Sequence, residues 1–120
     1  NLTAAVCGPN VTNMANTYLG CINLTDAVCG PNVIDMTNTY QYCSNLKNAV
    51  CGPLVETMFN TYRCCYNLQN ANIGNKVWLL YQTFMGCKSL KEFEHRICKI
   101  CNQKGKKYAK NIHWKNKRRL

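Results

Sequence analysis

Two of the ten cysteines in this 120-residue chain form the motif Cys98-Lys99-Ile100-Cys101. A CxxC pair is typical of a redox-active dithiol or of half a metal site. His95 and His113 flank the motif, so a His-Cys-Cys-His ligand set can be drawn. However, the chain has no second CxxC, and an oxidising compartment favours cystine. We therefore predict structural disulfides at Cys98 and Cys101, without a metal or other cofactor.

Hydrolysis and phosphoryl transfer have few suitable groups in this sequence. The chain has two histidines and five carboxylates, none of which recurs as a spaced pair, and it has no glycine-rich phosphate loop. An even number of cysteines leaves no obvious free thiol for nucleophilic catalysis. The expected protein is not an enzyme.

The basic C-terminal end is the clearest functional signal. Residues 1–87 carry three basic and three acidic side chains, so the whole net charge of +10 lies after them. Basic groups interleaved with aromatic ones suit an anionic partner, such as nucleic acid, a sulfated glycan, a membrane surface or an acidic host protein. The alternative is a solvated terminus that aids solubility. The candidate anion-binding residues are Lys104, Lys106, Lys107, Lys110, Trp114, Lys115, Lys117, Arg118 and Arg119.

The cysteine content predicts a secreted protein. Cysteine makes up about 8% of the chain, close to the density of disulfide scaffolds. Glycosylation sequons begin at Asn1, Asn10 and Asn23, of which Asn10 and Asn23 are the stronger candidate sites. No apolar run is long enough to span a membrane, and we expect a mature form whose targeting segment has been removed.

The chain is built from a 22-residue repeat. Residues 1–22, 23–44 and 45–66 are nearly identical, and residues 67–88 form a diverged fourth copy. Such a period marks an array of units that are stable only against their neighbours. We expect a single domain in which residues 89–101 form a capping helix and residues 102–120 form a basic tail.

The apolar spacing within each repeat predicts helices. Val33, Met36, Tyr40 and Cys43 recur at steps of three, four and three, which is one stripe on a helix that follows the Gly30-Pro31 break. Each unit then reads as a short helix, a break and a longer helix. The predicted fold class is all-α, a disulfide-stapled array of short antiparallel helices.

Antiparallel helices favour one disulfide scheme. Cysteines recur at positions 7 and 21 of each unit, and a helix roughly 18 Å long would separate the two within a unit, too far for a bridge. The preferred pairs are Cys7–Cys43, Cys29–Cys65 and Cys51–Cys87, with two further bridges among Cys21, Cys64, Cys98 and Cys101. A rival scheme pairs Cys21 with Cys29 and Cys43 with Cys51.

A tyrosine stands between the two cysteines of each complete repeat. Tyr18, Tyr40 and Tyr62 line either a ligand groove or, as we prefer, the core. The order Cys-Tyr-Cys is similar to the motifs of the bicycle family, secreted salivary effectors of gall-forming aphids. The resemblance covers residues 1–66 and implies a secreted, non-enzymatic protein that acts on a host. It assigns no binding residue.

These features predict a secreted, cysteine-rich interaction protein, effector- or toxin-like, whose basic tail holds an anionic partner. One alternative is a structural or matrix protein in which identical units and cystines provide durability. Another is a carrier that encloses a lipid-like ligand around Trp78, Leu80 and Phe84.

Overall fold

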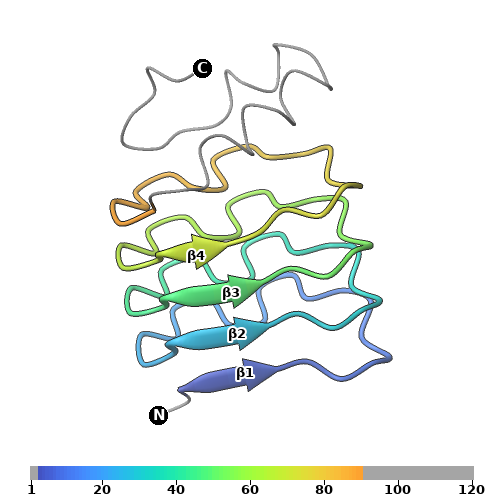
Figure 1. Ribbon diagram of the computed structural model, residues 1–120, viewed down its shortest axis with the longest axis horizontal. Helices are drawn as coiled ribbons and strands as arrows, with labels where there is room; N and C mark the ends of the chain where they lie inside the picture. Colours follow the sequence, from blue (N-terminus) through green and yellow to red (C-terminus); the bar gives the residue numbers. More distant parts are fainter. Residues whose placement is uncertain (1–2, 91–120) are drawn as a thin grey trace.

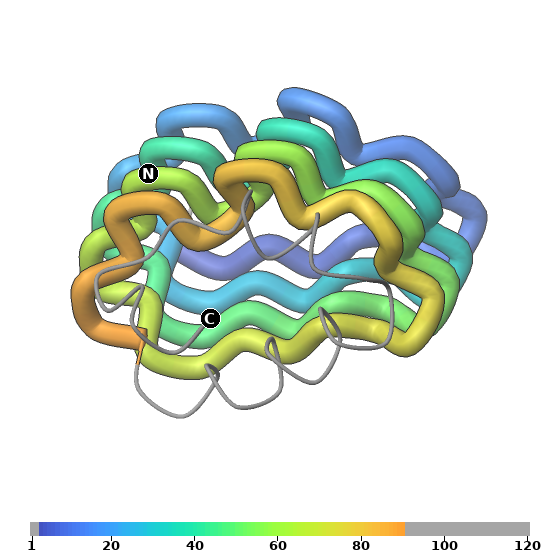
Figure 2. The backbone as a smooth tube through the Cα atoms, turned by 90° about the horizontal axis from the view of Figure 1, so that it is seen from above, coloured from blue at the N-terminus to red at the C-terminus, as the bar shows by residue number. Residues whose placement is uncertain are grey.

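The computed structural model describes residues 3–90, which wind into four stacked coils of one repeat each (Figure 1). We name them coil 1 (3–22), coil 2 (23–44), coil 3 (45–66) and coil 4 (67–88). Each coil contributes one short strand to a common face, and seen along the stack the coils overlie one another (Figure 2). The strands are β1 (Ala4–Val6), β2 (Asp26–Val28), β3 (Asn48–Val50) and β4 (Asn70–Ala71).

The four strands form a parallel sheet in the order β1-β2-β3-β4. Every residue pairs with its equivalent in the next coil, as Ala5 does with Ala27 and Ala27 with Ala49. We call the side of each coil that carries its strand the sheet side. An identical repeat thus produces columns of identical side chains along the stack.

The opposite side of each coil, residues 11–21 and their equivalents, is a series of β-turns that we call the turn side. The N–H of Thr17 donates to the carbonyl of Met14 at 3.1 Å, and the N–H of Cys21 donates to that of Tyr18 at 3.1 Å. Such bonds between residues three apart are typical of turns. Asn16 and Gly20 adopt left-handed backbone angles, with φ of 64° and 73°.

The prediction of an all-α fold is wrong, because the described residues contain parallel strands and no helix. The apolar spacing of three and four residues arises from consecutive β-turns, whose ends face inward at residues such as Met14, Tyr18 and Cys21. A left-handed residue inside each series, Asn16 in coil 1 and Asn38 in coil 2, prevents these turns from continuing as a helix.

Neighbouring coils are joined on the turn side by four backbone hydrogen bonds that point to the next coil, while the N–H groups of Ile34, Glu56 and Trp78 donate to the preceding coil. From coil 2 to coil 3, the N–H groups of Met36, Asn38, Tyr40 and Tyr42 donate at 2.8–2.9 Å to carbonyls of coil 3. Two buried side chains bond in the opposite direction. Thr61 Oγ1 donates to the Met36 carbonyl at 2.6 Å and Cys65 Sγ to the Tyr40 carbonyl at 3.0 Å.

Columns of apolar side chains fill the space between the two sides. The preferred placement of the tyrosines in the core is confirmed for Tyr40 and Tyr62, whose exposed fractions are 1% and 0%. Their rings stack with centroids 5.7 Å apart, and Tyr62 stacks in turn on Phe84. Tyr18, in coil 1, is half-buried. The other core columns contain Leu24, Leu46 and Leu68; Val33, Val55 and Val77; and Met14, Met36, Met58 and Leu80.

The coils approach one another closely where each strand ends. A Cβ atom on Gly52 would lie 2.5 Å from the carbonyl oxygen of Gly30. Glycine is therefore required at this position by contact with the preceding coil. A Cβ atom on Gly8, in coil 1, would have nothing within 4 Å.

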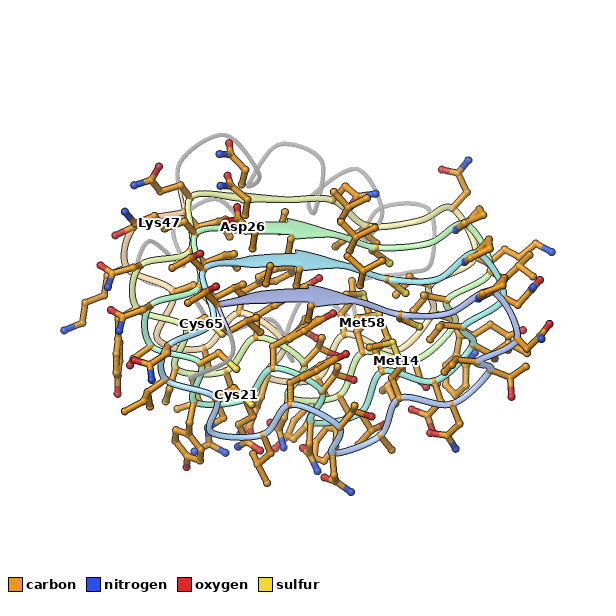
Figure 3. All side chains as sticks on the ribbon, turned by 90° about the horizontal axis from the view of Figure 1, so that it is seen from below. Met14, Cys21, Asp26, Lys47, Met58 and Cys65 are labelled. Atoms are coloured by element: carbon orange, nitrogen blue, oxygen red, sulfur yellow. The ribbon has the colours of Figure 1, made fainter. Side chains whose placement is uncertain are left out.

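The predicted disulfides are absent from the described residues, where all eight cysteines are free thiols. The predicted pairs, Cys7–Cys43, Cys29–Cys65 and Cys51–Cys87, required antiparallel helices. In parallel coils, the two cysteines of a repeat lie in separate columns. The column that contains Cys29 packs beside the methionines, with 3.8 Å between Cys29 Sγ and Met36 Sδ. The column that contains Cys21 and Cys65 lies away from Met14 and Met58, towards the other end of the coil (Figure 3).

The rival pairs, Cys21–Cys29 and Cys43–Cys51, are also absent, since all four of these thiols are free. Cys64 is a half-buried free thiol. Cys98 and Cys101, the predicted capping helix from residue 91 onward and the basic tail lie outside the described residues.

Candidate recognition surface

The outer face of the sheet carries two rows of exposed side chains, because alternate residues of a strand point to opposite faces. The central alanines Ala5, Ala27 and Ala49 point into the core and are at most 4% exposed. The residues on either side of each alanine point outward. A strand of three residues thus supplies one inward and two outward positions.

The first outward row is a ladder of polar side chains at the positions of Asp26, Asn48 and Asn70. Asn48 Nδ2 donates to Asp26 Oδ1 at 2.9 Å, and Asn70 Nδ2 donates to Asn48 Oδ1 at 2.8 Å. Thr25 Oγ1 donates to the second oxygen of Asp26 at 2.9 Å. The hydrogen bonds from Asn48 and Thr25 lower the pKa of Asp26. The carboxylate is therefore ionised and fixed in place.

The second outward row is apolar and consists of Val6, Val28 and Val50. Their exposed fractions are 77%, 45% and 53%, although valine is usually buried. We call these three residues the valine row. In coil 4 the row ends at Asn72, whose Oδ1 accepts a hydrogen bond from the Cys51 N–H at 2.6 Å. In coils 2 and 3 a backbone carbonyl, that of Val28 or Val50, fills this role.

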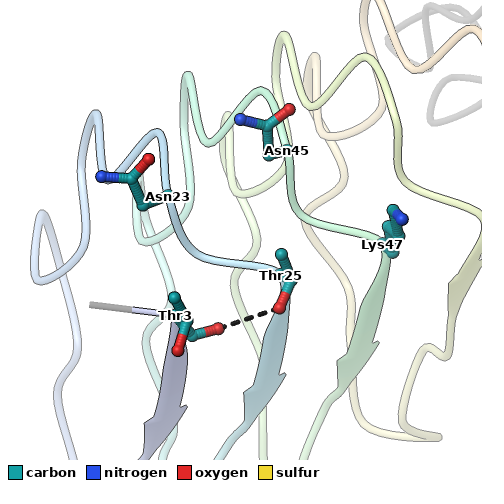
Figure 4. Close-up of a pocket in the computed structure, with 5 residues that line it drawn as sticks. All are labelled: Thr3, Asn23, Thr25, Asn45 and Lys47. Atoms are coloured by element: carbon teal, nitrogen blue, oxygen red, sulfur yellow. Dashed lines mark hydrogen bonds between the residues drawn. The ribbon is translucent and has the colours of Figure 1, made fainter. Parts of the chain in front are cut away.

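A polar pocket lies where the strands begin, with a cavity volume of about 480 Å³. Thr3, Thr25 and Lys47 stand at the starts of three neighbouring strands, and Asn23 and Asn45 stand on the loops beside them (Figure 4). Thr25 Oγ1 lies 3.1 Å from the Thr3 carbonyl. Asn45 Nδ2 donates to the Ile22 carbonyl at 2.7 Å. Among the described residues of the lining, Lys47 alone carries a charge.

The outer surface of the turn side differs in character. Phe59 and Tyr81 stack with ring centroids 5.3 Å apart, and Ile34 and Trp78 are 42% and 43% exposed. Trp78 is thus separated from buried Leu80 and Phe84, with which it was predicted to enclose a ligand. The residue type at each of these positions differs from coil to coil, whereas the valine row repeats one residue type in coils 1 to 3.

The remaining sequence-based site predictions have different outcomes. Asn10 and Asn23 are exposed, as a glycosylation site requires. Asn67, which is equivalent to Asn23, uses its amide nitrogen to bond the Ser44 carbonyl at 2.9 Å. The predicted anion-binding residues Lys104 to Arg119, together with His95 and His113, lie outside the described residues. Among residues 3–90, no three Cys, His, Asp or Glu side chains gather as a metal site.

The surface on the sheet was not predicted from the sequence. Its signal is the short stretch Thr-Asp-Ala-Val, in which an inward alanine alternates with outward residues. Within three residues, that alternation is too brief to be distinguished from a turn of helix.

Comparison with solved structures places the fold. The crystal structure of a T. pallidum leucine-rich repeat protein superposes with a TM-score of 0.74 at 20% sequence identity, covering 82% of this chain. The fold resembles that of a leucine-rich repeat protein. At this identity the likeness shows the fold alone, and the chain spans 49% of that structure.

No family model matches the sequence, and no curated protein does. Within residues 3–90, no helix has the length and apolar character needed to cross a membrane.

Proposed function

We propose that this protein is a non-enzymatic recognition module that binds a polypeptide partner on the outer face of its sheet. The observation that carries the proposal is the valine row, three apolar side chains in register on an exposed sheet. Stacked repeats of this kind create extended surfaces that suit macromolecular partners. Function then resides in the outward positions, and the inward columns maintain the scaffold.

The chemistry of the face suits a polypeptide. The valine row offers an apolar strip, and the adjacent ladder of Asp26, Asn48 and Asn70 offers a carboxylate and amides. An apolar centre flanked by polar groups is the usual composition of a protein interface. The ladder bonds hold these side chains before binding, which reduces the entropy lost when a partner binds.

A display selection tests this proposal. A library of random 16-residue peptides is selected against the immobilised full chain, and enriched peptides are measured by fluorescence anisotropy. The variant Val28→Asp/Val50→Asp is expected to bind them at least about tenfold more weakly, because it places charge in the apolar strip. The variant is expected to stay folded because both side chains are about half exposed. Circular dichroism checks this expectation.

The matched control is Ile34→Asp/Trp78→Asp, two residues of similar exposure on the turn side. Peptides that lose affinity for the valine variant and not for the control support the proposal. Peptides that lose affinity only for the control would overturn it and would place recognition on the turn side.

A further inference from the structure

We propose that the pocket lined by Thr3, Asn23, Thr25, Asn45 and Lys47 binds a carboxylate of an acidic side chain of the polypeptide held on the sheet. This inference rests on the proposed function and deepens it by naming the partner's chemistry. It starts from three observations: the cavity, a lysine in it that forms no ion pair with the described residues, and its position at the start of the strands that carry the valine row.

The charge in the pocket is positive, and Lys47 forms no ion pair with any of the described residues. Lys47 acts electrostatically on Asp26 of the neighbouring strand, without forming an ion pair with it. Both oxygens of Asp26 are already engaged, one by Asn48 and the other by Thr25. The exposed Lys47 ammonium can bond an incoming anion, and a charge-assisted bond to a carboxylate is stronger than a neutral one.

The backbone beneath the lysine is held firmly. The Lys47 N–H donates to the Thr25 carbonyl at 2.8 Å, and the Lys47 carbonyl accepts from Gln69 at 2.9 Å. The base of the side chain is thus fixed in the sheet while the ammonium is exposed. Asn45, on the neighbouring loop, is tied to the Ile22 carbonyl and supports the pocket wall.

The lysine also departs from the repeat. The same position holds threonine in coils 1 and 2, as Thr3 and Thr25, and glutamine in coil 4, as Gln69. The column of asparagines on the loop beside it does not change, since Asn23, Asn45 and Asn67 occupy one position. One coil therefore supplies the charge within a frame of hydroxyl and amide groups.

The pocket is continuous with the recognition surface. Lys47 directly precedes β3, and Val50 is the last residue of that strand. The two residues are three positions apart, which corresponds to about 10 Å of extended chain. A polypeptide that covers the valine row reaches the pocket with an acidic side chain a few residues away. The preferred partner therefore combines an apolar segment with a nearby Asp or Glu.

The test uses the peptides selected on the full chain and their amide counterparts, in which each Glu or Asp is replaced by Gln or Asn. Acidic peptides are expected to bind about tenfold more weakly to Lys47→Glu, whereas their amide counterparts lose little. The acidic peptides, and not the amides, should also weaken as salt is raised. Lys76→Glu is the matched control, because it makes the same charge change at an exposed residue outside the pocket.

Three outcomes contradict the inference, and they separate it from the proposed function. If affinity depends on Val28 and Val50 but is equal for Lys47→Glu and wild type, the carboxylate site is wrong and the recognition surface stands. If affinity depends on neither the valines nor Lys47, both proposals are wrong. Equal weakening by Lys47→Glu and Lys76→Glu would show a general charge effect and would also overturn the pocket.

Discussion

The two sides of each coil differ in the bonds that join them to neighbouring coils and in how far their outward side chains vary along the stack. On the turn side, four backbone bonds from coil 2 and the buried side-chain bonds of Thr61 and Cys65 link coil 2 to coil 3. On the sheet side, a strand of at most three residues makes the link, and its outward side chains change from Ala4 to Asp26 to Asn48. We infer that the turn side contributes most of the stability, and that the outward side chains of the sheet side can vary to recognise a partner.

Removing a ring from the turn-side stack should have the largest effect. Tyr62 is fully buried between Tyr40 and Phe84. Tyr62→Ala should lower the free energy of unfolding by about 3–5 kcal/mol, because a large cavity is left. Urea denaturation measures the loss. Tyr66→Ala, at an exposed residue, is the control, and an equal loss there would contradict the assignment of stability to the stack.

A methyl group at the join between the two sides should have the next largest effect. Gly52→Ala places a Cβ 2.5 Å from the Gly30 carbonyl, so the coils must separate, at a cost of about 1–3 kcal/mol. Gly8→Ala makes the same change where nothing lies within 4 Å. Thermal unfolding of the two variants compares them directly. Similar melting temperatures would mean that the coils are not in close contact at this point.

A single turn-side hydrogen bond should contribute less. Thr61→Val keeps the shape of the side chain and removes one donor to the Met36 carbonyl, which still accepts from the Thr39 N–H, so the loss should be about 0.5–1.5 kcal/mol. Thr17→Val is the control, since Thr17 is exposed in coil 1. Chemical denaturation should show a smaller loss for the control. A larger loss for Thr17→Val than for Thr61→Val would contradict a stabilising role of the buried threonines.

The buried thiols predict a smaller, pH-dependent effect. Burial raises the pKa of Cys43 to about 11 and those of Cys51 and Cys87 to about 12, from an ordinary value of 9.0. Below pH 9 these thiols are protonated in both folded and unfolded chains. Above it the unfolded chain loses protons first, so stability falls as pH rises towards 11 and 12.

Melting temperatures between pH 7 and pH 10 measure this fall. Cys51→Val should flatten it, because Ile73 shows that the column accepts an apolar side chain. A slope identical to that of wild type would assign the pH dependence to other groups. In the native state, iodoacetamide should label half-buried Cys7, Cys21 and Cys64 before the buried thiols.

The smallest effect is expected on the sheet side. Val50→Thr replaces a side chain that is 53% exposed with one that also favours strands, so the free energy of unfolding should change by less than about 0.5 kcal/mol. Denaturation under the conditions used for Tyr62→Ala provides the value. A change comparable to that of Thr61→Val would mean that the valine row is a structural element, which contradicts the division between the two sides.

The sequence predicts the repeat, the inward tyrosines and the break at each Gly-Pro pair, because identical units must stack identical side chains. It does not distinguish a helix from a series of β-turns, since both place apolar residues three or four apart, as in Met36, Tyr40 and Cys43. A period of 22 residues favours a strand and return turns, because helical pairs need 33 or more. Asparagine at 16, 38 and 60 is a second signal, since asparagine tolerates left-handed angles.

For the eight cysteines of the described residues, the disulfide prediction was wrong because cysteine count was taken as a sign of cystine. In the structure, Cys43, Cys65 and Cys87 donate hydrogen bonds to carbonyls of the preceding coil. Cysteine thus recurs as a small buried donor, a role that composition does not reveal. Secretion stays a prediction, which now rests on the sequons and no longer on described disulfides.

The turn-side hydrogen bonds give the stack an electrical direction. In each of coils 1 to 3 four turn-side N–H groups donate to the next coil, whereas those of Ile34, Glu56 and Trp78 donate to the preceding coil, so most of these peptide dipoles point the same way along the stack. The edge of coil 1 formed by the carbonyls of Asn13, Ala15, Thr17 and Leu19 is therefore a negative pole, and the N–H side of coil 4 is a positive one. The two ends of the stack therefore differ in the partial charge of their backbone groups, although the repeats are nearly identical.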